Sequence, residues 1–461
     1  AKHIMVKKQK SGNKLILAIV FSVLTYWLFA QSFINISTEV QATYHTTTAV
    51  VNLSVSLASF ATGIFMVGAG DVADKIGKLK MTYIGIILSV IGSVLIIISS
   101  VTAFLIIGRV LQGLSAAILL PATVGVLNDQ FKGQALRKAF SYLMIASVGG
   151  VGFASMVGGF VATYMTWQVN FVISIVIALI AFVLLLGTKE VEKEIIDRQP
   201  FDYIGMCLFA VMIGSITLFM TQGFERGWLS VFSVSCLIIF IISGVVFLLF
   251  ERKKAMPFID FSLFKHRAFV GSSLSNVIMN SGIGMMTVFN MYVQTAIGLN
   301  AFQAGLVTVP YVLMAIFMVR IGERLSVRYG GKPMLLVGPL FPSMGLILIS
   351  LTILPPQWYI VAATIGFVIC AIGNGLCATP GLTIALLTVP DEKVGLATGL
   401  YKMCATLGGA FGIALSTTVY AILQTHTSIE MAAMGTFLIT LCIMATGVIM
   451  TQLIIPKHTK A

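Results

Sequence analysis

Long apolar segments dominate this chain, and they set the strongest limit on what it can fold into. A helix needs about 20 predominantly apolar residues to cross the hydrocarbon core of a bilayer. The segments lack the alternation over about ten residues that a membrane β-barrel requires, so the sequence predicts an all-α membrane protein. Fourteen membrane spans are expected, at residues 15–36, 51–70, 81–100, 104–128, 139–163, 169–188, 202–222, 229–250, 268–296, 301–321, 333–353, 357–388, 395–424 and 432–455.

The composition excludes a soluble domain. The chain of 461 residues is 58% hydrophobic and only 10% charged, whereas soluble domains carry about 25% charged residues. The six cysteines all lie inside apolar segments, so they are expected to be buried side chains and not a disulfide framework. No cleavable signal peptide is expected, because the first apolar segment is long enough to span and lacks a cleavage site of small residues.

The positions of the basic residues predict how the spans are oriented. Cytoplasmic loops of membrane proteins carry an excess of Lys and Arg. Of the 29 Lys and Arg residues, only Arg226 falls in a loop of the opposite face, while Arg109 and Lys402 fall within spans. Cytoplasmic N- and C-termini are therefore expected. The net charge of +13 is explained by membrane topology, and no nucleic-acid partner is expected.

Two longer cytoplasmic loops, 189–202 and 251–267, divide the spans into groups of six, two and six. The sequence GAGDVADKIGKLK at 68–80 is weakly repeated as RIGERLSVRYGGK at 320–332, in each case after the second span of a six-span group. A repeat of six-helix units with a site between them is a known transporter plan. The expected regions are a cytoplasmic tail at 1–14 (with 1–4, before Met5, a remnant of cloning), a six-helix bundle at 15–188, a linker region with two extra transmembrane helices at 189–267, a second six-helix bundle at 268–455 and a cytoplasmic tail at 456–461.

The turn between the second and third spans, GDVADKIGK at 70–78, carries the first chemical signal. Gly70 permits close helix approach and Gly77 permits a tight turn. Asp74 places a carboxylate at a helix end, where it can engage the positive N-terminus of a neighbouring helix or a basic side chain. We interpret the turn as a conformational latch, the alternative being a basic, solvated turn. Its residues are Gly70, Asp74, Lys75, Gly77 and Lys78.

This turn resembles the loop signature of the major facilitator superfamily, G-x-x-x-D-[KR]-x-G-[KR]. The fourth span adds GRVLQGLSAA at 108–117, which is similar to the R-x-x-x-G signature of the proton-driven drug exporters. The number of spans, QPFDYIGM at 199–206 and QGFERGW at 222–228 resemble the 14-helix drug:proton antiporter branch. The stretches FAQSFINIS at 29–37 and AFSYLMIASVGGVGF at 139–153 resemble the Nor-type quinolone exporters. The resemblance implies a major-facilitator fold with 14 transmembrane helices.

Arg109 is the leading candidate for proton coupling. A cation near the middle of a membrane is costly, so it must face protein or water, and it usually marks function. The resemblance implies that Arg109 takes part in proton transfer by biasing a nearby acid. Glu39 and Asp129 are the candidate proton carriers, because they lie at ends of helices expected to line the cavity. The alternative is a structural arginine that donates hydrogen bonds to carbonyl groups.

Uncharged polar side chains in the spans are the candidates for binding substrate. Gln31 and Asn35 are four residues apart and share a helix face. In the 14-helix branch that this segment resembles, an aspartate occupies the position of Ala30 and a proline occupies the position of Glu39. The charge that the family carries at position 30 is therefore absent from this chain. Met and aromatic side chains would supply an adaptable wall for varied apolar ligands. The candidate substrate-binding residues are Gln31, Asn35, Gln112, Asn276, Asn280, Asn290, Gln294 and Asn374.

The fifth span carries glycines at a spacing that lets helices pack closely, in GGVGFASMVGG at 149–159. It resembles the antiporter signature G-x-x-x-G-P-x-x-G-G, but Ala154 and Ser155 stand where the family has Gly-Pro. We interpret Gly150, Gly158 and Gly159 as a helix-packing gate. Close packing without a gating role is the alternative.

The sequence carries no enzyme signature. It lacks a phosphate-binding loop with its Lys-Ser/Thr pair and any histidine spacing typical of a metal site. No metal or cofactor is therefore expected, and the proton gradient is the expected energy source. The predicted function is proton-coupled export of amphipathic, cationic or zwitterionic compounds such as quinolone-like drugs and dyes, by a lipid-embedded monomer in a bacterial plasma membrane. Two alternatives remain: an exporter of a physiological metabolite or lipid with incidental drug transport, and a membrane sensor that does not transport.

Overall fold

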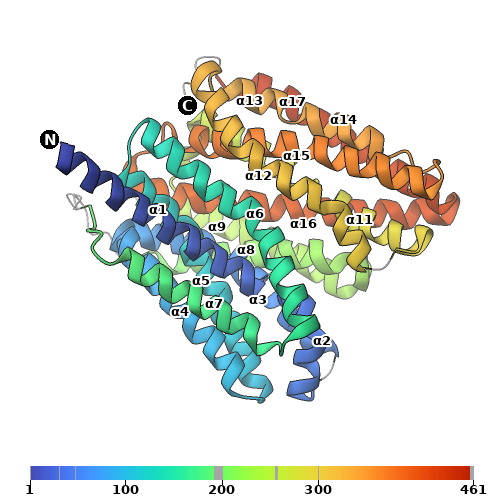
Figure 1. Cartoon of the computed structure of the whole chain (residues 1–461), viewed down its shortest axis with the longest axis horizontal. Helices are drawn as coiled ribbons and strands as arrows, with labels where there is room; N and C mark the ends of the chain where they lie inside the picture. The colour runs from blue at the N-terminus through green and yellow to red at the C-terminus, as the bar shows by residue number, and fades with distance from the viewer. Residues whose placement is uncertain are drawn as a thin grey trace. The chain divides into compact units, whose positions relative to one another are not determined.

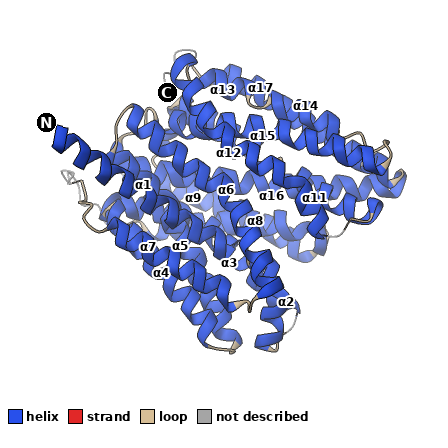
Figure 2. Cartoon of the chain, in the orientation of Figure 1, coloured by secondary structure: helices blue, strands red, loops and turns tan. Residues whose placement is uncertain are grey.

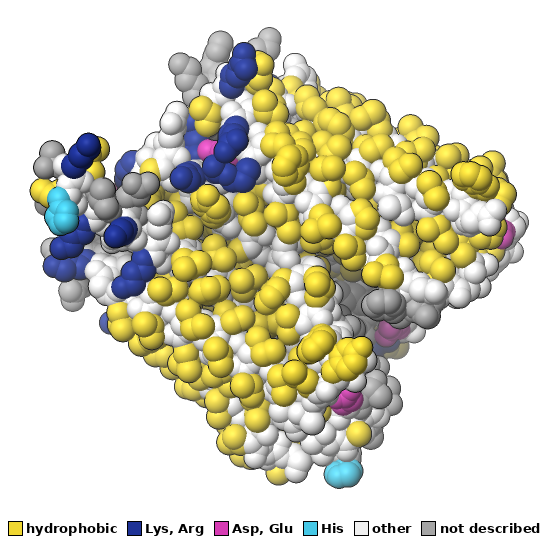
Figure 3. All heavy atoms as spheres, in the orientation of Figure 1, with side chains coloured by type: hydrophobic (Ala, Val, Ile, Leu, Met, Phe, Trp, Pro, Cys, Tyr) yellow, Lys and Arg dark blue, Asp and Glu magenta, His cyan; other side chains and the backbone are white. Residues whose placement is uncertain are grey.

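The computed structural model describes residues 2–30, 32–46, 48–191, 201–254, 258–299 and 301–456. Helices and short connecting loops make up these residues, and no strand occurs among them (Figure 2). Apolar side chains cover most of the visible face in Figure 3, as expected of helices that contact lipid.

The chain divides into two compact units, whose helices carry their labels in Figure 1. The first unit comprises Ala1–Asp202 and Pro390–Lys402, and the second comprises Tyr203–Val389 and Met403–Ala461. Helix α16, Val394–His426, is therefore shared, since its first turns pack with the first unit.

The other helices of the first unit are α1 Lys2–Ala30, α2 Phe33–Tyr44, α3 Thr48–Ile76, α4 Lys78–Ile98, α5 Thr102–Gln130, α6 Gln134–Tyr164, α7 Gln168–Leu185 and the 3-10 helix η3 Asp391–Lys393. The helices of the second unit are α8 Tyr203–Arg226, α9 Val231–Arg252, η1 Phe261–Lys265, α10 Arg267–Asn280, α11 Ile283–Tyr292, the π-helix η2 Val293–Ile297, α12 Ala301–Tyr329, α13 Gly331–Val337, α14 Leu340–Ile349, α15 Pro356–Leu386 and α17 Ile429–Ile454.

Each unit buries an apolar core between its helices. In the first unit α5 packs against α3 and α4, and α1 packs against α6 and α7. Aromatic side chains fill one end of this core, among them Phe29, Phe33 and Phe171. In the second unit α15 packs against α12 and α14, α10 packs against α17, and α8 pairs with α9. Phe289, Phe367 and Phe437 belong to the core of that unit.

Thirteen helices in the described residues are long and apolar enough to cross a membrane. The remaining expected span, 268–296, is interrupted, because α10 ends at Asn280 and α11 begins at Ile283. Ser281 and Gly282 lie between them, and Ser-Gly pairs are a common cause of helix kinks. The Ser281 hydroxyl donates to the carbonyl of Ile278 at 2.5 Å, where it competes with the helical hydrogen bonds. Among the described residues the structure thus contains thirteen candidate spans, of which Gly331–Ile349 is itself divided into α13 and α14, and one further segment, 268–296, that is interrupted between α10 and α11.

The first expected span, 15–36, also has different limits in the structure. Helix α1 begins at Lys2 and ends at Ala30, and α2 begins at Phe33. At this joint the hydroxyl of Ser32 donates to the carbonyl of Ala154 on α6, at 2.6 Å. The polar stretch after Phe29 therefore coincides with a break in the helix, and the carbonyl groups at the end of α1 need partners from elsewhere.

Candidate functional site

Arg109 on α5 is fully buried and contacts three other helices, at the end of α1, the start of α2 and the second turn of α3. Its Nη1 donates to the carbonyl of Phe29 on α1 at 2.6 Å, and its Nε donates to the carbonyl of Ser54 on α3 at 2.8 Å. The guanidinium carbon lies 4.1 Å from the ring centroid of Phe33, the first residue of α2. Arg109 therefore holds both sides of the α1–α2 joint.

The helix break explains why a cation belongs at this place. The last four carbonyl groups of a helix have no partner within the helix, and the C-terminal end carries a partial negative charge. Arg109 binds the Phe29 carbonyl, and the side-chain amide of Asn170 on α7 donates to the neighbouring Leu28 carbonyl at 3.1 Å. These two side chains cap α1 from inside the helix bundle. These contacts match those that the alternative interpretation of a structural arginine requires.

Gln112 lies one turn after Arg109, and both ends of its amide are engaged. Its Oε1 accepts from Arg109 Nη1 at 2.8 Å, and its Nε2 donates to Ser93 Oγ on α4 at 3.0 Å. Arg109 and Gln112 therefore form a buried hydrogen-bonded pair on one face of α5.

Asp74 at the end of α3 binds the first turn of α16. Its two carboxylate oxygens accept from the backbone N–H of Gly395 at 2.7 Å and of Leu396 at 2.8 Å. The first N–H groups of a helix lack partners within the helix, and this end carries a partial positive charge. Lys78 Nζ also lies 3.9 Å from Asp74 Oδ1. Both kinds of contact expected of Asp74 are therefore present.

Lys78 joins Asp74 to a second acid, Asp129. The Lys78 side chain is buried; its Nζ lies 3.4 Å from Asp129 Oδ1 and donates to the carbonyl of Asp391 at 2.9 Å. Asn128 Nδ2 donates to the Asp391 carboxylate at 3.1 Å, which ties the end of α5 to the same segment. Asp129, expected as a proton carrier, thus lies in an ion-paired cluster with the latch residues.

The other residues of the expected latch shape its turn. Gly77 has a φ of +133°, which favours glycine. The Glu190 carboxylate accepts from the N–H groups of Leu79 and Lys80 at 3.1 and 3.4 Å and so caps the start of α4. Lys75 pairs with Asp71 at 3.0 Å, separately from Asp74.

The expected substrate-binding residues lie in several places. Asn280 Nδ2 donates to both the carbonyl and Oδ1 of Asn276 at 2.8 Å, so these two side chains bind each other on α10. Asn374 donates to the Tyr311 hydroxyl. Asn290 is half-buried on α11, and Gln294 is exposed in η2. Gln31 and the side chain of Asn35 lie outside the described residues.

Comparisons with known proteins decide the family. Residues 15–413 match the family model of the Major Facilitator Superfamily. The chain belongs to this superfamily. It is also 41% identical, over 449 residues and 97% of each chain, to the "Quinolone resistance protein NorB" of Staphylococcus aureus strain MRSA252, and equally identical to that of strain COL.

Solved structures agree on the fold of this facilitator. A proton:xylose symporter, XylE, aligns with a TM-score of 0.68 at 13% identity, covering 98% of each chain. The human organic anion transporter MFSD10 aligns with a TM-score of 0.65 at 11% identity, covering 95% of this chain and 99% of that one. Identities this low show the fold alone. The family and the many apolar helices together make the protein a multi-pass membrane transporter and not an enzyme.

Three residues at the facilitator's latch were not selected from the sequence: Asn128, Glu190 and Asp391. One signal could have found Asp391. The stretch PDEKVG at 390–395 places two adjacent acids shortly before the glycine that opens the thirteenth expected span. Asn128 and Glu190 gave no such signal, because their partners lie far away in the sequence.

The glycines of α6 differ in their surroundings. A Cβ added at Gly150 would lie 2.3 Å from Cδ1 of Trp27 on α1, so this glycine permits close packing of α6 on α1. Gly158 is buried, whereas Gly159 is exposed and an added Cβ there would meet no atom within 4 Å. The remaining candidate, Glu39, is half-buried on α2, and its carbonyl accepts from the Thr43 hydroxyl at 3.1 Å.

The close contact between α3 and α16 predicts that adding one methyl group at Gly70 will strongly lower the transport rate. A Cβ at Gly70 would lie 2.2 Å from the carbonyl oxygen of Gly395, which is backbone and cannot move aside alone. We expect Gly70→Ala to separate α16 from Asp74 and to lower the transport rate about tenfold, since overpacking costs about 1–3 kcal/mol. Gly305→Ala, at an exposed glycine of α12 where an added Cβ would meet no atom within 4 Å, is the matched control and should keep the wild-type rate. Equal rates for both variants in vesicle uptake would contradict the role of this contact.

Proposed function

We propose that this chain is a proton-coupled multidrug efflux antiporter of a bacterial plasma membrane, which exports amphipathic cationic or zwitterionic compounds, quinolones among them. The observation that carries the proposal is 41% identity over 97% of the chain to a protein named for quinolone resistance. A family model of transporters that matches residues 15–413 supports the mode of action. The proton gradient is the proposed energy source, with no cofactor.

The proposed topology has 14 transmembrane helices in groups of six, two and six, with both termini cytoplasmic. Helices α10 and α11 would form one kinked span, and α8 and α9 the extra pair, which is supported by their packing against each other. The proposed regions are those expected from the sequence, with bundles at 15–188 and 268–455. The distribution of Lys and Arg supports the orientation. The transporter is proposed to act as a monomer surrounded by lipid.

The proposed mechanism is alternating access, in which protons and drug favour different conformations of the transporter. The latch of Asp74 on the start of α16 would form in one conformation and open in the other. Asp129 shares Lys78 with Asp74, so a proton on Asp129 would weaken the attraction that holds Lys78 in the latch. This supports a role for Asp129 in coupling protonation to the latch, beside Glu39 as a carrier.

Arg109 is proposed to couple protonation to the joint between α1 and α2. Its charge lies against the carbonyl end of α1 and over the Phe33 ring of α2, so any change in its partners alters the hold on both helices. Substrate would bind to polar side chains of the spans, for which Gln31, Asn35, Gln112, Asn276, Asn280, Asn290, Gln294 and Asn374 remain the candidates.

Transport in proteoliposomes tests this function. Purified protein is reconstituted, and uptake of a quinolone and of a permanently charged dye is measured under an imposed pH gradient and, separately, an imposed voltage. We expect the acidic-lumen gradient to drive accumulation of both compounds. The permanently charged dye and protein-free liposomes control for passive trapping of weak bases. Binding of drug without flux would identify a sensor, and proton flux elicited by a metabolite and not by drugs would identify a metabolite exporter; either result would contradict the proposal.

A further inference from the structure

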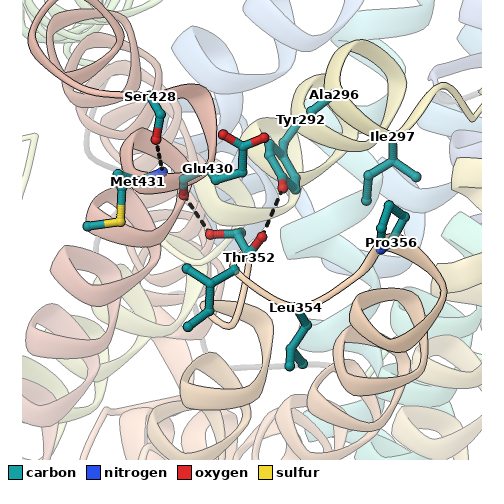
Figure 4. A pocket seen from close by; sticks show the side chains of 10 residues that line it. Tyr292, Ala296, Ile297, Thr352, Leu354, Pro356, Ser428, Glu430 and Met431 are labelled. Carbon is teal, nitrogen blue, oxygen red and sulfur yellow. Dashed lines mark hydrogen bonds between the residues drawn. The ribbon is translucent and has the colours of Figure 1, made fainter.

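A cavity of about 360 Å³ lies inside the second unit, at the end of α11 and the start of α17. It is distinct from Arg109 and from the latch, which belong to the first unit. Figure 4 shows its side chains, which come from α11, η2, the loop after α14, the start of α15 and the start of α17. The lining residues are Tyr292, Ala296, Ile297, Thr352, Ile353, Leu354, Pro356, Ser428, Glu430 and Met431.

Thr352 ties the walls of this cavity together. The Tyr292 hydroxyl donates to the carbonyl of Thr352 at 3.4 Å, and the Thr352 hydroxyl donates to the carbonyl of Glu430 at 2.5 Å (Figure 4). Tyr292 is buried and meets the ring of Tyr359 edge to face, with centroids 5.6 Å apart. The cavity is therefore held by fixed contacts from three separate segments, and it is not a gap beside one mobile loop.

The charge in the cavity has one sign. Glu430 is half-buried in the first turn of α17, so its carboxyl group lies near the partial positive charge of that helix end. None of the ten lining residues is basic. A carboxylate that is partly removed from water attracts a cation more strongly than an exposed one does. The cavity therefore favours a positively charged ligand.

The other walls suit an apolar body on that ligand. Ile297, Leu354 and Pro356 are aliphatic, and Met431 adds a polarizable thioether. Tyr292 adds an aromatic ring of the kind that attracts alkylammonium groups. Ligand sites commonly have about 300–1,000 Å³, and the volume of this cavity lies within that range.

We propose that this cavity binds a compact organic cation of the quaternary ammonium class, with its ammonium group beside Glu430 and its apolar part against Leu354 and Pro356. The site is additional to the drug-transport site, and its occupation does not depend on transport. It gives the second unit a cation-binding site of its own.

Protection of a thiol at the rim of the cavity tests the proposal. Ile353 lines the cavity and is 68% exposed, so Ile353→Cys places a thiol there with little loss of packing. The full chain in lipid nanodiscs is treated with a charged thiol reagent, and labelling at position 353 is quantified by peptide mass spectrometry. We expect benzyltrimethylammonium to slow this labelling saturably. Leu229→Cys, at a loop position that is 93% exposed, is the control and should show no protection.

Charge dependence separates the proposed site from general apolar binding. Adding Glu430→Gln should raise the half-protecting concentration about tenfold or more, because the ammonium group loses its charged partner. Glu225→Gln removes an exposed acid outside the cavity and should leave that concentration unchanged. Neopentylbenzene, the neutral carbon isostere, should give no protection.

Several outcomes would overturn the proposal. The first is labelling at position 353 that benzyltrimethylammonium does not slow. The second is the same half-protecting concentration with and without Glu430→Gln, and the third is slower labelling in the presence of neopentylbenzene. Adding Arg109→Ala should leave the protection unchanged, since that residue lies in the other unit. Loss of protection on Arg109→Ala but not on Glu430→Gln would show that the cation acts from the transport site. Thermal unfolding of each variant confirms that it is folded, so failure here is distinct from failure of drug transport.

Discussion

Replacing Arg109 with alanine should abolish proton-driven drug accumulation in proteoliposomes. The substitution leaves the carbonyls of Phe29 and Ser54 and the Gln112 amide oxygen without their buried donor. Each buried acceptor that loses its partner costs about 1–3 kcal/mol, so the α1–α2 joint should no longer be held in this conformation. We expect a loss of at least about 100-fold in the rate of accumulation.

Two further measurements separate coupling from a purely structural role of Arg109. Drug exchange between equal concentrations needs no proton gradient, so the Arg109→Ala protein should retain exchange while losing accumulation. Arg109→Lys keeps the charge but lacks the planar fork that reaches two carbonyls and an amide at once, and it should restore only part of the activity. Unchanged proton-coupled export by Arg109→Ala would refute the coupling role. Loss of exchange together with accumulation, accompanied by a lower Tm, would assign Arg109 to structure alone.

Replacing Asp74 with asparagine should lower turnover about tenfold or more while leaving drug binding intact. An amide has one acceptor oxygen and no charge, so it cannot bind the N–H groups of Gly395 and Leu396 as the carboxylate does. The loss also leaves the buried Lys78 with one acid fewer. The conformation that the latch stabilises should therefore be less populated, and the cycle should slow at that step.

Initial rates of dye uptake and equilibrium dye binding measure the two effects of Asp74→Asn separately. Asp71→Asn is the matched control, three residues earlier on the same helix. Its carboxylate is buried but pairs with the partly exposed Lys75 of its own helix and not with the start of α16, so the rate of this variant should fall much less than that of the Asp74→Asn protein. Normal turnover in the Asp74→Asn protein would refute the latch.

Hydropathy and local motifs predicted much of this molecule. Apolar length predicted helical membrane spans, since the spans must satisfy every backbone group internally. The local pattern at 70–78 predicted that Asp74 would engage a helix end, because the acid, the glycines and the lysines all belong to one turn. In these cases the information lies within a few neighbouring residues.

Features that depend on distant residues were missed. Hydropathy could not locate the break between Asn280 and Ile283, because Ser and Gly are tolerated in continuous spans as well as at kinks. Asp391 meets Lys78 across more than 300 positions of sequence, and only the packing of the helices brings them together. The pairing of Asn276 with Asn280 was also not foreseen, although their spacing permits it, because a sequence does not show whether an amide faces its neighbour or a ligand.

Arg109 and Asp74 both bind main-chain atoms and not side chains, and this affects which substitutions the transporter can tolerate. Arg109 binds the carbonyl groups of Phe29 and Ser54, and Asp74 binds the N–H groups of Gly395 and Leu396. Main-chain atoms are the same whatever side chain is attached. Substitutions at Phe29, Ser54 or Leu396 that preserve the backbone therefore leave the atoms of these contacts in place. Substitutions that change which drug is bound can therefore accumulate on these helices while the contacts of Arg109 and Asp74 stay unchanged.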